Sequence, residues 1–336
     1  MDKPVGVIIL NWNGARLLRR YLPSVVSGNS NDIAEVVVVD NGSTDESRKV
    51  LETEFPGVKT LYFDKNYGFA EGYNRALEAL DYKYSVLLNS DVAVPEDWVR
   101  PMFDYMEQHS DVAACQPKLL ADTDRSRFEY AGASGGFIDK LGYPFCRGRL
   151  FDTVEQDNGQ YDDVADIFWA TGAALFVRTD VYRKVGGLDP FFFAHMEEID
   201  LCWRIHRAGY AIRVIPQSVA YHLGGGSLPA SNPRKTYLNF RNNLFLLYKN
   251  LPRREGRKVL LVRRLYDTLA FLMFLAKFDF GNARAVLKAH RDYARLHSRY
   301  DGVQPDAPLK DDFPCFRVNL VLSYHLRHKH LFSELF

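Results

Sequence analysis

Runs of apolar residues separated by helical patterns fill the first quarter of the chain. The runs cover residues 5–10, 36–39, 58–63 and 86–88. Each has the length of a buried strand, and apolar residues recur at helical spacing in the segments between them. Four β/α units in about 90 residues predict an α/β fold with a mostly parallel sheet, flanking helices and right-handed crossovers.

The glycines near these strands exclude a Rossmann dinucleotide site. No Gly-x-Gly-x-x-Gly motif follows any of the four runs, and Gly68 and Gly72 have the wrong spacing for one. We expect these two glycines to loosen a loop before a helix over residues 75–80.

The middle of the chain has a less regular pattern. Residues 98–108 predict a helix and residues 112–116 a short strand. Residues 122–163, rich in Gly, Asp and aromatic side chains, predict loops with short strands, the kind of insertion that shapes a substrate cleft. Further on, residues 169–177 predict a strand, residues 195–210 a helix closed by Gly209, and residues 211–215 another strand.

The composition changes after residue 226, so we expect a first domain over residues 1–226 and a mainly helical segment over 227–336. Residues 253–299 hold twelve Lys or Arg against four acids, with apolar residues between them at helical spacing. A basic helical face of this kind is either solvated or docks on an anionic membrane surface.

Composition narrows the function further. Hydrophobic residues make up 47% of the 336 positions and the net charge is +1, so no global attraction to nucleic acid is expected. The four cysteines are far apart, the N-terminus lacks a secretory pattern, and no apolar run near the C-terminus approaches the roughly 20 residues that span a bilayer. These features predict a cytoplasmic protein, peripheral on the inner membrane if the basic face docks there.

Acidic residues gather where strands end. Asp40 and Asp45 follow the second run, and Asp91 follows the fourth. Ligands bind beyond the carboxyl ends of strands in open α/β sheets, so an acid there can hold a cation against a phosphorylated substrate. The simpler interpretation of Asp91 is a turn residue before Pro95.

A third acidic group lies at the start of the helix over residues 195–210. Glu197 and Asp200 are three residues apart and share one helix face, while Glu198 points elsewhere. Such clusters are usually surface charge. Their aromatic and apolar neighbours indicate partial burial, which would raise a carboxyl pKa toward the range of a general base.

Together these segments resemble family 2 glycosyltransferases of the GT-A fold, especially the bacterial rhamnosyltransferase-like branch. The resemblance covers roughly residues 4 to 250 and rests on an ordered set of motifs: VIILNWNG, VVVVDNGSTD, NYGFAEGYN, LLNSDV, TGA, GGLD, MEEIDLCWR, YHLGGGS and NPRKTYLNFRNN.

The resemblance implies a nucleotide-sugar site built from residues at the strand ends. Its members are Asn11, Trp12, Asn13, Asp40, Asp45, Asn66, Gly68, Asn74, Asn89, Ser90 and Asp91. Asn11 and Trp12 match positions that line the base pocket, and Asp40 and Asp45 match acids that contact base and ribose.

The resemblance also implies a metal and a base. Asn89 and Asp91 stand at the family's Asp-x-Asp motif, where Asn89 departs from the two-acid form. Asp91 and His222 are then the expected ligands of Mg²⁺ or Mn²⁺. Glu198 stands where the family's catalytic Asp is expected, with Glu197 as the alternative base and Asp200 as the third catalytic acid.

The function implied is inverting, metal-dependent transfer of a sugar from a nucleotide diphospho-sugar, such as dTDP-rhamnose, to a hydroxyl of a glycan or lipid-linked glycan in bacterial surface polysaccharide synthesis. Two alternatives remain open. A nucleotidyltransferase would need a basic, Gly-rich loop near the N-terminus, where NWNGARLLRR offers only three arginines. A non-catalytic carbohydrate-binding protein would keep the fold without turnover.

Overall fold

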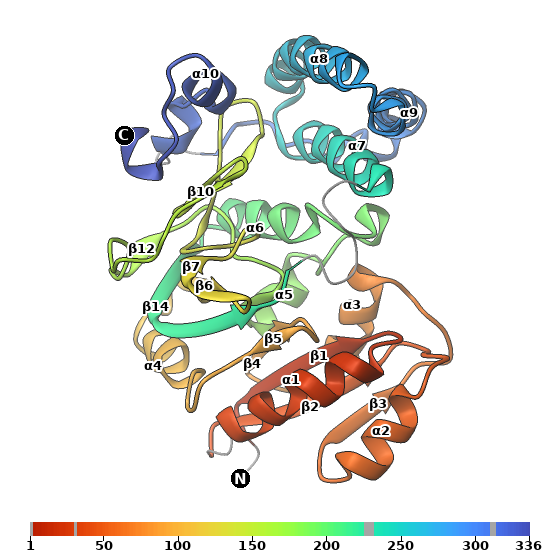
Figure 1. The fold of residues 1–336 in the computed structure, drawn as a ribbon, viewed down its shortest axis with the longest axis vertical. Helices are drawn as coiled ribbons and strands as arrows, with labels where there is room; N and C mark the ends of the chain where they lie inside the picture. Colours follow the sequence, from red (N-terminus) through yellow and green to blue (C-terminus); the bar gives the residue numbers. More distant parts are fainter. Residues whose placement is uncertain (1–2, 30–31, 225–231, 310–313) are drawn as a thin grey trace.

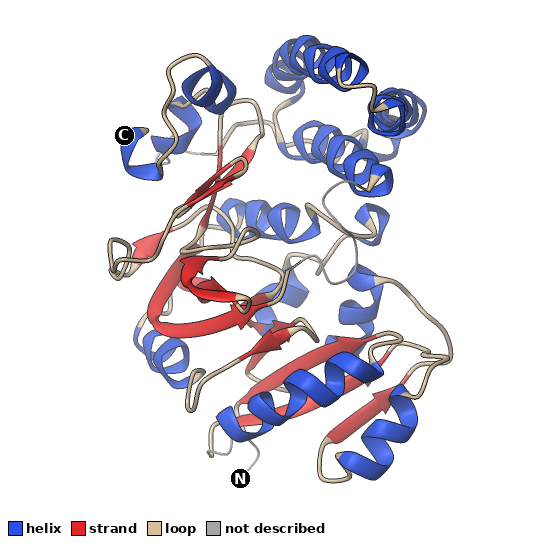
Figure 2. Ribbon diagram, viewed as in Figure 1, coloured by secondary structure: helices blue, strands red, loops and turns tan. Residues whose placement is uncertain are grey.

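A central sheet with helices on both faces forms the body of the protein (Figures 1 and 2). The computed structural model describes residues 3–29, 32–224, 232–309 and 314–336. The main sheet has the strand order β12-β14-β6-β13-β4-β1-β2-β3, with β5 paired to β14 and β7 paired to β6. The predicted α/β architecture is confirmed.

The N-terminal half contains the four predicted β/α units. Its strands are β1 (Val5–Asn11), β2 (Ala34–Asp40), β3 (Lys59–Tyr62) and β4 (Tyr84–Leu88), all parallel in the order β3-β2-β1-β4. Its helices are α1 (Ala15–Gly28), α2 (Ser47–Glu54) and α3 (Phe69–Ala79). α3 begins six residues before the predicted helix, because Gly72 packs against Leu10 inside the helix instead of loosening a loop.

The second half of the sheet mixes strand directions. It adds β5 (Val92–Ala93), β6 (Val112–Ala121), β7 (Asp124–Phe128), β12 (Ala165–Asp166), β13 (Ala174–Arg178) and β14 (Ala211–His222). β13 lies antiparallel between β4 and β6. β6 and β14 pair along most of their length, which makes both longer than the predicted strands at residues 112–116 and 211–215.

Helices and a small sheet complete this part. The helices are α4 (Arg100–Gln108), α5 (Thr179–Lys184), a 3₁₀ turn at Pro190–Phe192 and α6 (Glu197–Arg207). One apolar core joins α1, α2 and α4 to one sheet face, and another joins α3, α5 and α6 to the other. The insertion forms an antiparallel sheet of β8 (Gly136–Ile138), β9 (Pro144–Cys146), β10 (Arg149–Leu150) and β11 (Thr153–Val154), in agreement with the predicted short strands.

The C-terminal segment is helical, as predicted. It consists of α7 (Pro233–Asn250), α8 (Arg253–Ala276), α9 (Phe280–Leu296) and α10 (Leu320–His325), with 3₁₀ turns at His297–Tyr300, Pro314–Arg317 and Phe332–Glu334. Residues 225–227 of the YHLGGGS motif lie outside the described residues. In the part of the chain that the structure describes, no helix has the length and apolar content needed to cross a membrane.

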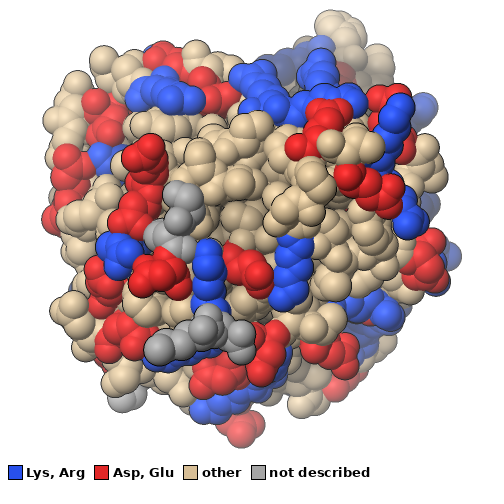
Figure 3. All heavy atoms as spheres, turned by 90° about the horizontal axis from the view of Figure 1, so that it is seen from below, with Lys and Arg blue, Asp and Glu red and all other residues tan. Residues whose placement is uncertain are grey.

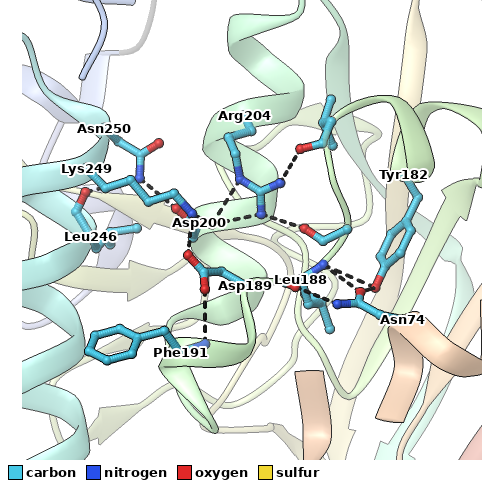
Figure 4. Close-up of polar contacts among 12 residues, drawn as sticks. Asn74, Tyr182, Leu188, Asp189, Phe191, Asp200, Arg204, Leu246, Lys249 and Asn250 are labelled. Atoms are coloured by element: carbon cyan, nitrogen blue, oxygen red, sulfur yellow. Dashed lines mark hydrogen bonds and ion pairs between the residues drawn. The ribbon is translucent and has the colours of Figure 1, made fainter. Parts of the chain in front are cut away.

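A buried ion cluster joins α6 to α7 (Figure 4). The fully buried Asp200 accepts hydrogen bonds from Lys249 Nζ at 2.8 Å, Arg204 Nε at 2.9 Å and Asn250 Nδ2 at 2.8 Å. Lys249 Nζ also lies 2.7 Å from Asp189. Burial alone would raise the pKa of Asp200, but Arg204 and Lys249 hold it below its ordinary value.

Replacing Lys249 with Met tests how much this cluster contributes to the stability of the fold. Removing one partner of a buried ion pair leaves the other charge uncompensated, so the free energy of unfolding should fall by about 3 kcal/mol. Lys49→Met, at an exposed position on α2, is the matched control and should change it by less than about 0.5 kcal/mol. Urea titration followed by circular dichroism measures both, and similar values for the two variants would contradict a structural role for the cluster.

Candidate active site

Two polar residues end neighbouring parallel strands and form the floor of the site. Asn11 of β1 and Asp40 of β2 stand side by side in the strand register, and Asn11 Nδ2 donates to Asp40 Oδ2 at 3.1 Å. The backbone N–H of Ser43 donates to the other Asp40 oxygen at 2.9 Å. Both side chains are buried, whereas the neighbouring Trp12 is 55% exposed. An exposed aromatic ring beside buried polar groups is suited to stacking on a planar base.

Asn13 and Asp45 make hydrogen bonds to the backbone of the loops around the site. Asn13 Oδ1 accepts from the backbone N–H of Thr44 at 2.7 Å. The Asp45 carboxylate accepts from the N–H of Ala15 at 3.0 Å and of Ser47 at 2.9 Å, so it holds the starts of α1 and α2. Burial alone would raise the pKa of Asp45, but these hydrogen bonds lower it. Asp45 shapes the loop beside the site.

Asn41, which we did not single out from the sequence, fixes the loop that carries Asn66 and Gly68. Its Nδ2 donates to Asn66 Oδ1 at 3.1 Å and to the Gly68 carbonyl at 3.0 Å, and its Oδ1 accepts from the N–H of Tyr67 at 3.0 Å. The sequence could have indicated a role for Asn41, because it follows Asp40 directly in the VVVVDNGSTD motif.

Asn74 points toward Leu188 and Tyr182 (Figure 4). Its Nδ2 donates to the Leu188 carbonyl at 2.7 Å, and its Oδ1 accepts from the Leu188 N–H at 2.9 Å and from the Tyr182 hydroxyl at 2.6 Å. With both ends of the amide engaged, Asn74 anchors the Gly-Gly-Leu-Asp segment that leads toward α6.

Strand pairing brings Asp91 and His222 together across 131 positions of sequence. β5, directly after Asp91, pairs with the end of β14 so that Val92 stands opposite His222. His222 Nε2 lies 3.1 Å from Asp91 Oδ1, and Asn89 Nδ2 lies 3.5 Å from the same ring nitrogen. The turn over Asn89, Ser90 and Asp91 therefore places a carboxylate beside the imidazole at the end of β14.

Glu129, a buried residue that the sequence analysis missed, lies on the other side of His222. Its Oε1 is 3.3 Å from His222 Nδ1, at ion-pair distance but without hydrogen-bond geometry. Burial alone would lower the pKa of His222, but without a cation Asp91 and Glu129 raise it to about 10, so a bound cation would take the place of the proton on Nε2. A carboxylate behind a histidine sets which ring nitrogen is free to bind a cation, the usual outer-shell arrangement at metal sites.

The Asp91 and His222 donors fit a divalent cation shared with a ligand. Two donor atoms roughly 3 Å apart subtend about a right angle at a cation about 2.1 Å from each, as in octahedral coordination. Within residues 3–29, 32–224, 232–309 and 314–336, no three or more His, Cys, Asp or Glu side chains are grouped to hold a metal ion. A cation bound here would need further oxygens from a substrate, and diphosphate oxygens supply them in many Mg²⁺ and Mn²⁺ sites.

The TGA motif connects this edge to the acidic helix. The backbone N–H of Asn89 donates to the Ala173 carbonyl at 3.0 Å, so the Thr171–Gly172–Ala173 turn lies against the end of β4. A Cβ at Gly172 would lie 3.7 Å from the Glu198 Cβ and 3.5 Å from Phe69. These are ordinary contact distances, so the turn packs directly against the start of α6, and Glu198 lies beside it.

The backbone before α6 is held in an unusual conformation. Phe193, His195 and Met196 have φ values of 66°, 69° and 73°, in the left-handed region that such residues rarely adopt. Asn242 of α7 donates to the carbonyls of Phe192 at 2.9 Å, Ala194 at 2.8 Å and His195 at 2.7 Å. These bonds explain how the strained loop persists, and they assign a positioning function to the NPRKTYLNFRNN motif.

Two glutamates at the start of α6 have raised pKa values. Burial raises the pKa of Glu198 to about 7. For Glu197, burial and the nearby Glu198 raise the pKa well above its ordinary value. Neither Oε2 atom has a hydrogen-bond partner. Glu198 is partly exposed while Glu197 is buried, although the Oε2 atom of each is shielded from solvent.

Asp200 is the catalytic candidate that the structure disfavours. All its contacts are with Arg204, Lys249 and Asn250, and its pKa is lowered. A general base that works near neutral pH needs a free lone pair and a pKa near the working pH. Asp200 pairs with Arg204 one turn along the same helix, whereas Glu198 lies on another face of it.

Comparison with solved structures identifies the fold. The chain aligns over 90% of its length with GalNAc-T7 bound to UDP, GalNAc and Mn²⁺ (TM-score 0.58, 13% identity, 59% of that chain). It also aligns over 90% with residues 1–349 of S. aureus TarS in complex with UDP-GlcNAc (TM-score 0.57, 14% identity, 84% of that chain). The fold is that of the GT-A glycosyltransferases, in agreement with the sequence-based expectation.

Sequence comparison finds a family match for part of the chain. Residues 6–161 match Glycosyl transferase family 2. The chain is 25% identical over 238 residues to the N-acetylglucosaminyl-diphospho-decaprenol L-rhamnosyltransferase of Mycobacterium tuberculosis, covering 66% of this chain and 76% of that protein. Residues 6–161 thus form a family 2 glycosyltransferase domain, and the chain is a glycosyltransferase that resembles the rhamnosyltransferases of this family.

Proposed function

We propose that the protein transfers a sugar, with inversion, from a nucleotide diphospho-sugar to a hydroxyl of a lipid-linked glycan in surface polysaccharide synthesis. One observation carries the proposal: the TGA turn joins the Asp91–His222 pair to a glutamate whose pKa lies near neutrality. The mycobacterial relative, named for a lipid-diphosphate-linked substrate and a rhamnosyl group, supports a lipid-linked acceptor and a rhamnosyl donor.

The strand ends bind the donor in this proposal. Trp12 stacks on the base, while Asn11 and Asp40 hold the polar edge beneath it. Asp91 and His222 would hold Mg²⁺ or Mn²⁺ against the diphosphate, and Glu129 orients the imidazole. The cation supplies positive charge that stabilises the departing nucleoside diphosphate.

Glu198 acts as the general base. Its carboxylate takes the proton of the acceptor hydroxyl as that oxygen bonds to the anomeric carbon, and the bond from that carbon to the diphosphate breaks on the opposite face. The proton ends on Glu198 and the electron pair of the broken bond on the diphosphate, so configuration inverts. A pKa of about 7 suits this exchange, since the base is then both available and strong enough near neutral pH.

Glu198→Gln should reduce kcat by about 10²- to 10⁴-fold, the usual contribution of a general base. A base must be deprotonated, so kcat/KM of the parent enzyme should rise with pH through about 7, and the variant should lose this limb. Glu197→Gln is the matched control and should retain most of the activity. The reverse pattern would assign the base to Glu197, and full activity in Glu198→Gln would exclude its role.

Asp91→Asn should abolish the metal-dependent part of donor binding. A ligand that binds only the folded state raises the melting temperature by mass action, so thermal shifts with nucleoside diphosphates and nucleotide sugars, each with and without Mn²⁺, report the site and its base preference. Asp81→Asn, at an exposed position, should retain the parent's Mn²⁺-dependent shift. An unchanged shift in Asp91→Asn would contradict the proposed cation site.

A further inference from the structure

α8 presents an unusual outer surface for a helix of a folded protein. Only Gly256, Arg263 and Asp267 of its 24 residues are buried. An apolar patch begins in its middle and continues around the turn into α9; it comprises Leu261, Leu265, Leu269, Leu272, Met273, Phe278 and Phe280, each between 50% and 80% exposed. Leu261, Leu265 and Leu269 recur every four residues, so they form one continuous stripe. A contiguous exposed patch of this kind marks an interaction surface.

The charges on α8 are strongly one-sided. Its exposed cations, with the residue that follows the helix, are Arg253, Arg254, Arg257, Lys258, Arg264 and Lys277. α8 has two acidic residues, and Glu255 is the exposed one. The other, Asp267, is buried and bonded to Arg263 and His290. At the opposite end of the molecule, seen in Figure 3, basic and acidic side chains alternate around an uncharged centre. The basic bias is a local property of the end of the molecule where α8 lies (Figure 1).

A cationic pocket lies beside the apolar patch, between α7, α8 and α9. Its volume is about 330 Å³, and its charged and aromatic lining residues are Arg253, Arg257, Arg264, His290, His297, Tyr248, Tyr293 and Asp301. Asp301 is the carboxylate of this described lining and accepts from the Tyr248 hydroxyl. Among the described residues no carboxylate lies within 4.0 Å of the three arginine side chains. Guanidinium groups gathered without acidic partners favour a phosphate ligand.

We propose that this end of the molecule docks on an anionic phospholipid bilayer. The cationic pocket holds a lipid phosphate group, and the apolar patch enters the boundary between headgroups and acyl chains. Leu261 belongs to both the pocket and the patch, so one lipid can contact both. Basic residues beside exposed Leu and Phe are the features of helices that lie in a membrane interface. Docking would bring the protein to the membrane in which the acceptor of the proposed function is anchored. Vesicle binding can be tested with neither donor nor acceptor.

Flotation of the full chain with phospholipid vesicles tests the proposal. Vesicles containing phosphatidylglycerol should bind the protein, vesicles of phosphatidylcholine alone should bind it far less, and high salt should weaken binding. Arg257→Gln/Arg264→Gln should weaken binding by about 30-fold, at about fivefold for each basic residue near an anionic surface. Leu265→Ser/Leu269→Ser should weaken it at least about tenfold through lost apolar burial.

A charge-matched control separates the pocket from general electrostatic attraction. Lys49→Gln/Lys83→Gln removes two exposed cations from the part of the molecule that holds α2 and β4 and should change vesicle binding less than about twofold. A similar loss in the control and the pocket variant would overturn the pocket's role. Nucleotide thermal shifts should be unchanged in all these variants, which separates failure of docking from failure of the donor site.

Two further outcomes would replace the membrane with another occupant. If inorganic phosphate binds the vesicle-free protein by calorimetry and phosphatidylglycerol vesicles do not, the pocket is a site for a soluble anion. If sedimentation shows dimers that Leu265→Ser/Leu269→Ser abolishes, and vesicles again fail to bind, the patch is an interface between two copies. Either result overturns the proposal.

Discussion

The geometry of the site depends on one buried carboxylate. Asp200 sits inside the protein, where an ionised group is stable only with cations and hydrogen-bond donors around it. α7 supplies Lys249 and Asn250 for this purpose, and α6 itself supplies Arg204. The position of α6 along α7 is therefore fixed by charge as well as by apolar packing. Glu198, two residues earlier on α6, takes its place beside Gly172 as a consequence.

The parts of the site that follow strand ends could be predicted from the sequence. Apolar runs located β1, β2 and β4, and a parallel sheet brings their carboxyl ends to one edge. The strand pattern alone therefore predicts a site that contains Asp40 and Asp91, whereas the role of Asn11 is predicted by the family resemblance. The proximity of Asp91 and His222 could be predicted only from the family resemblance. β5 has two residues, which is too short for a periodic pattern that would predict its pairing with β14.

Other roles depend on contacts between distant residues and could not be predicted in the same way. Glu129 sits after an edge strand in the insertion, and only the folded chain shows it behind His222. Asp45 and Asn74 have the residue types of ligand-binding groups, but their polar atoms bond to the backbone of neighbouring loops. A motif shows which residue is present. The hydrogen bonds that the residue makes in the folded chain determine which of its polar atoms are available to a ligand.

The three hydrogen bonds from Asn242 to the loop before α6 have an evolutionary consequence. The segment that matches the family ends at residue 161, yet the conformation of residues 192–196 is imposed by a helix that starts at Pro233. Recombination that exchanged the C-terminal helices between relatives would exchange this restraint as well. Turnover and whatever the C-terminal helices recognise are thus inherited as one unit, although they lie far apart along the chain.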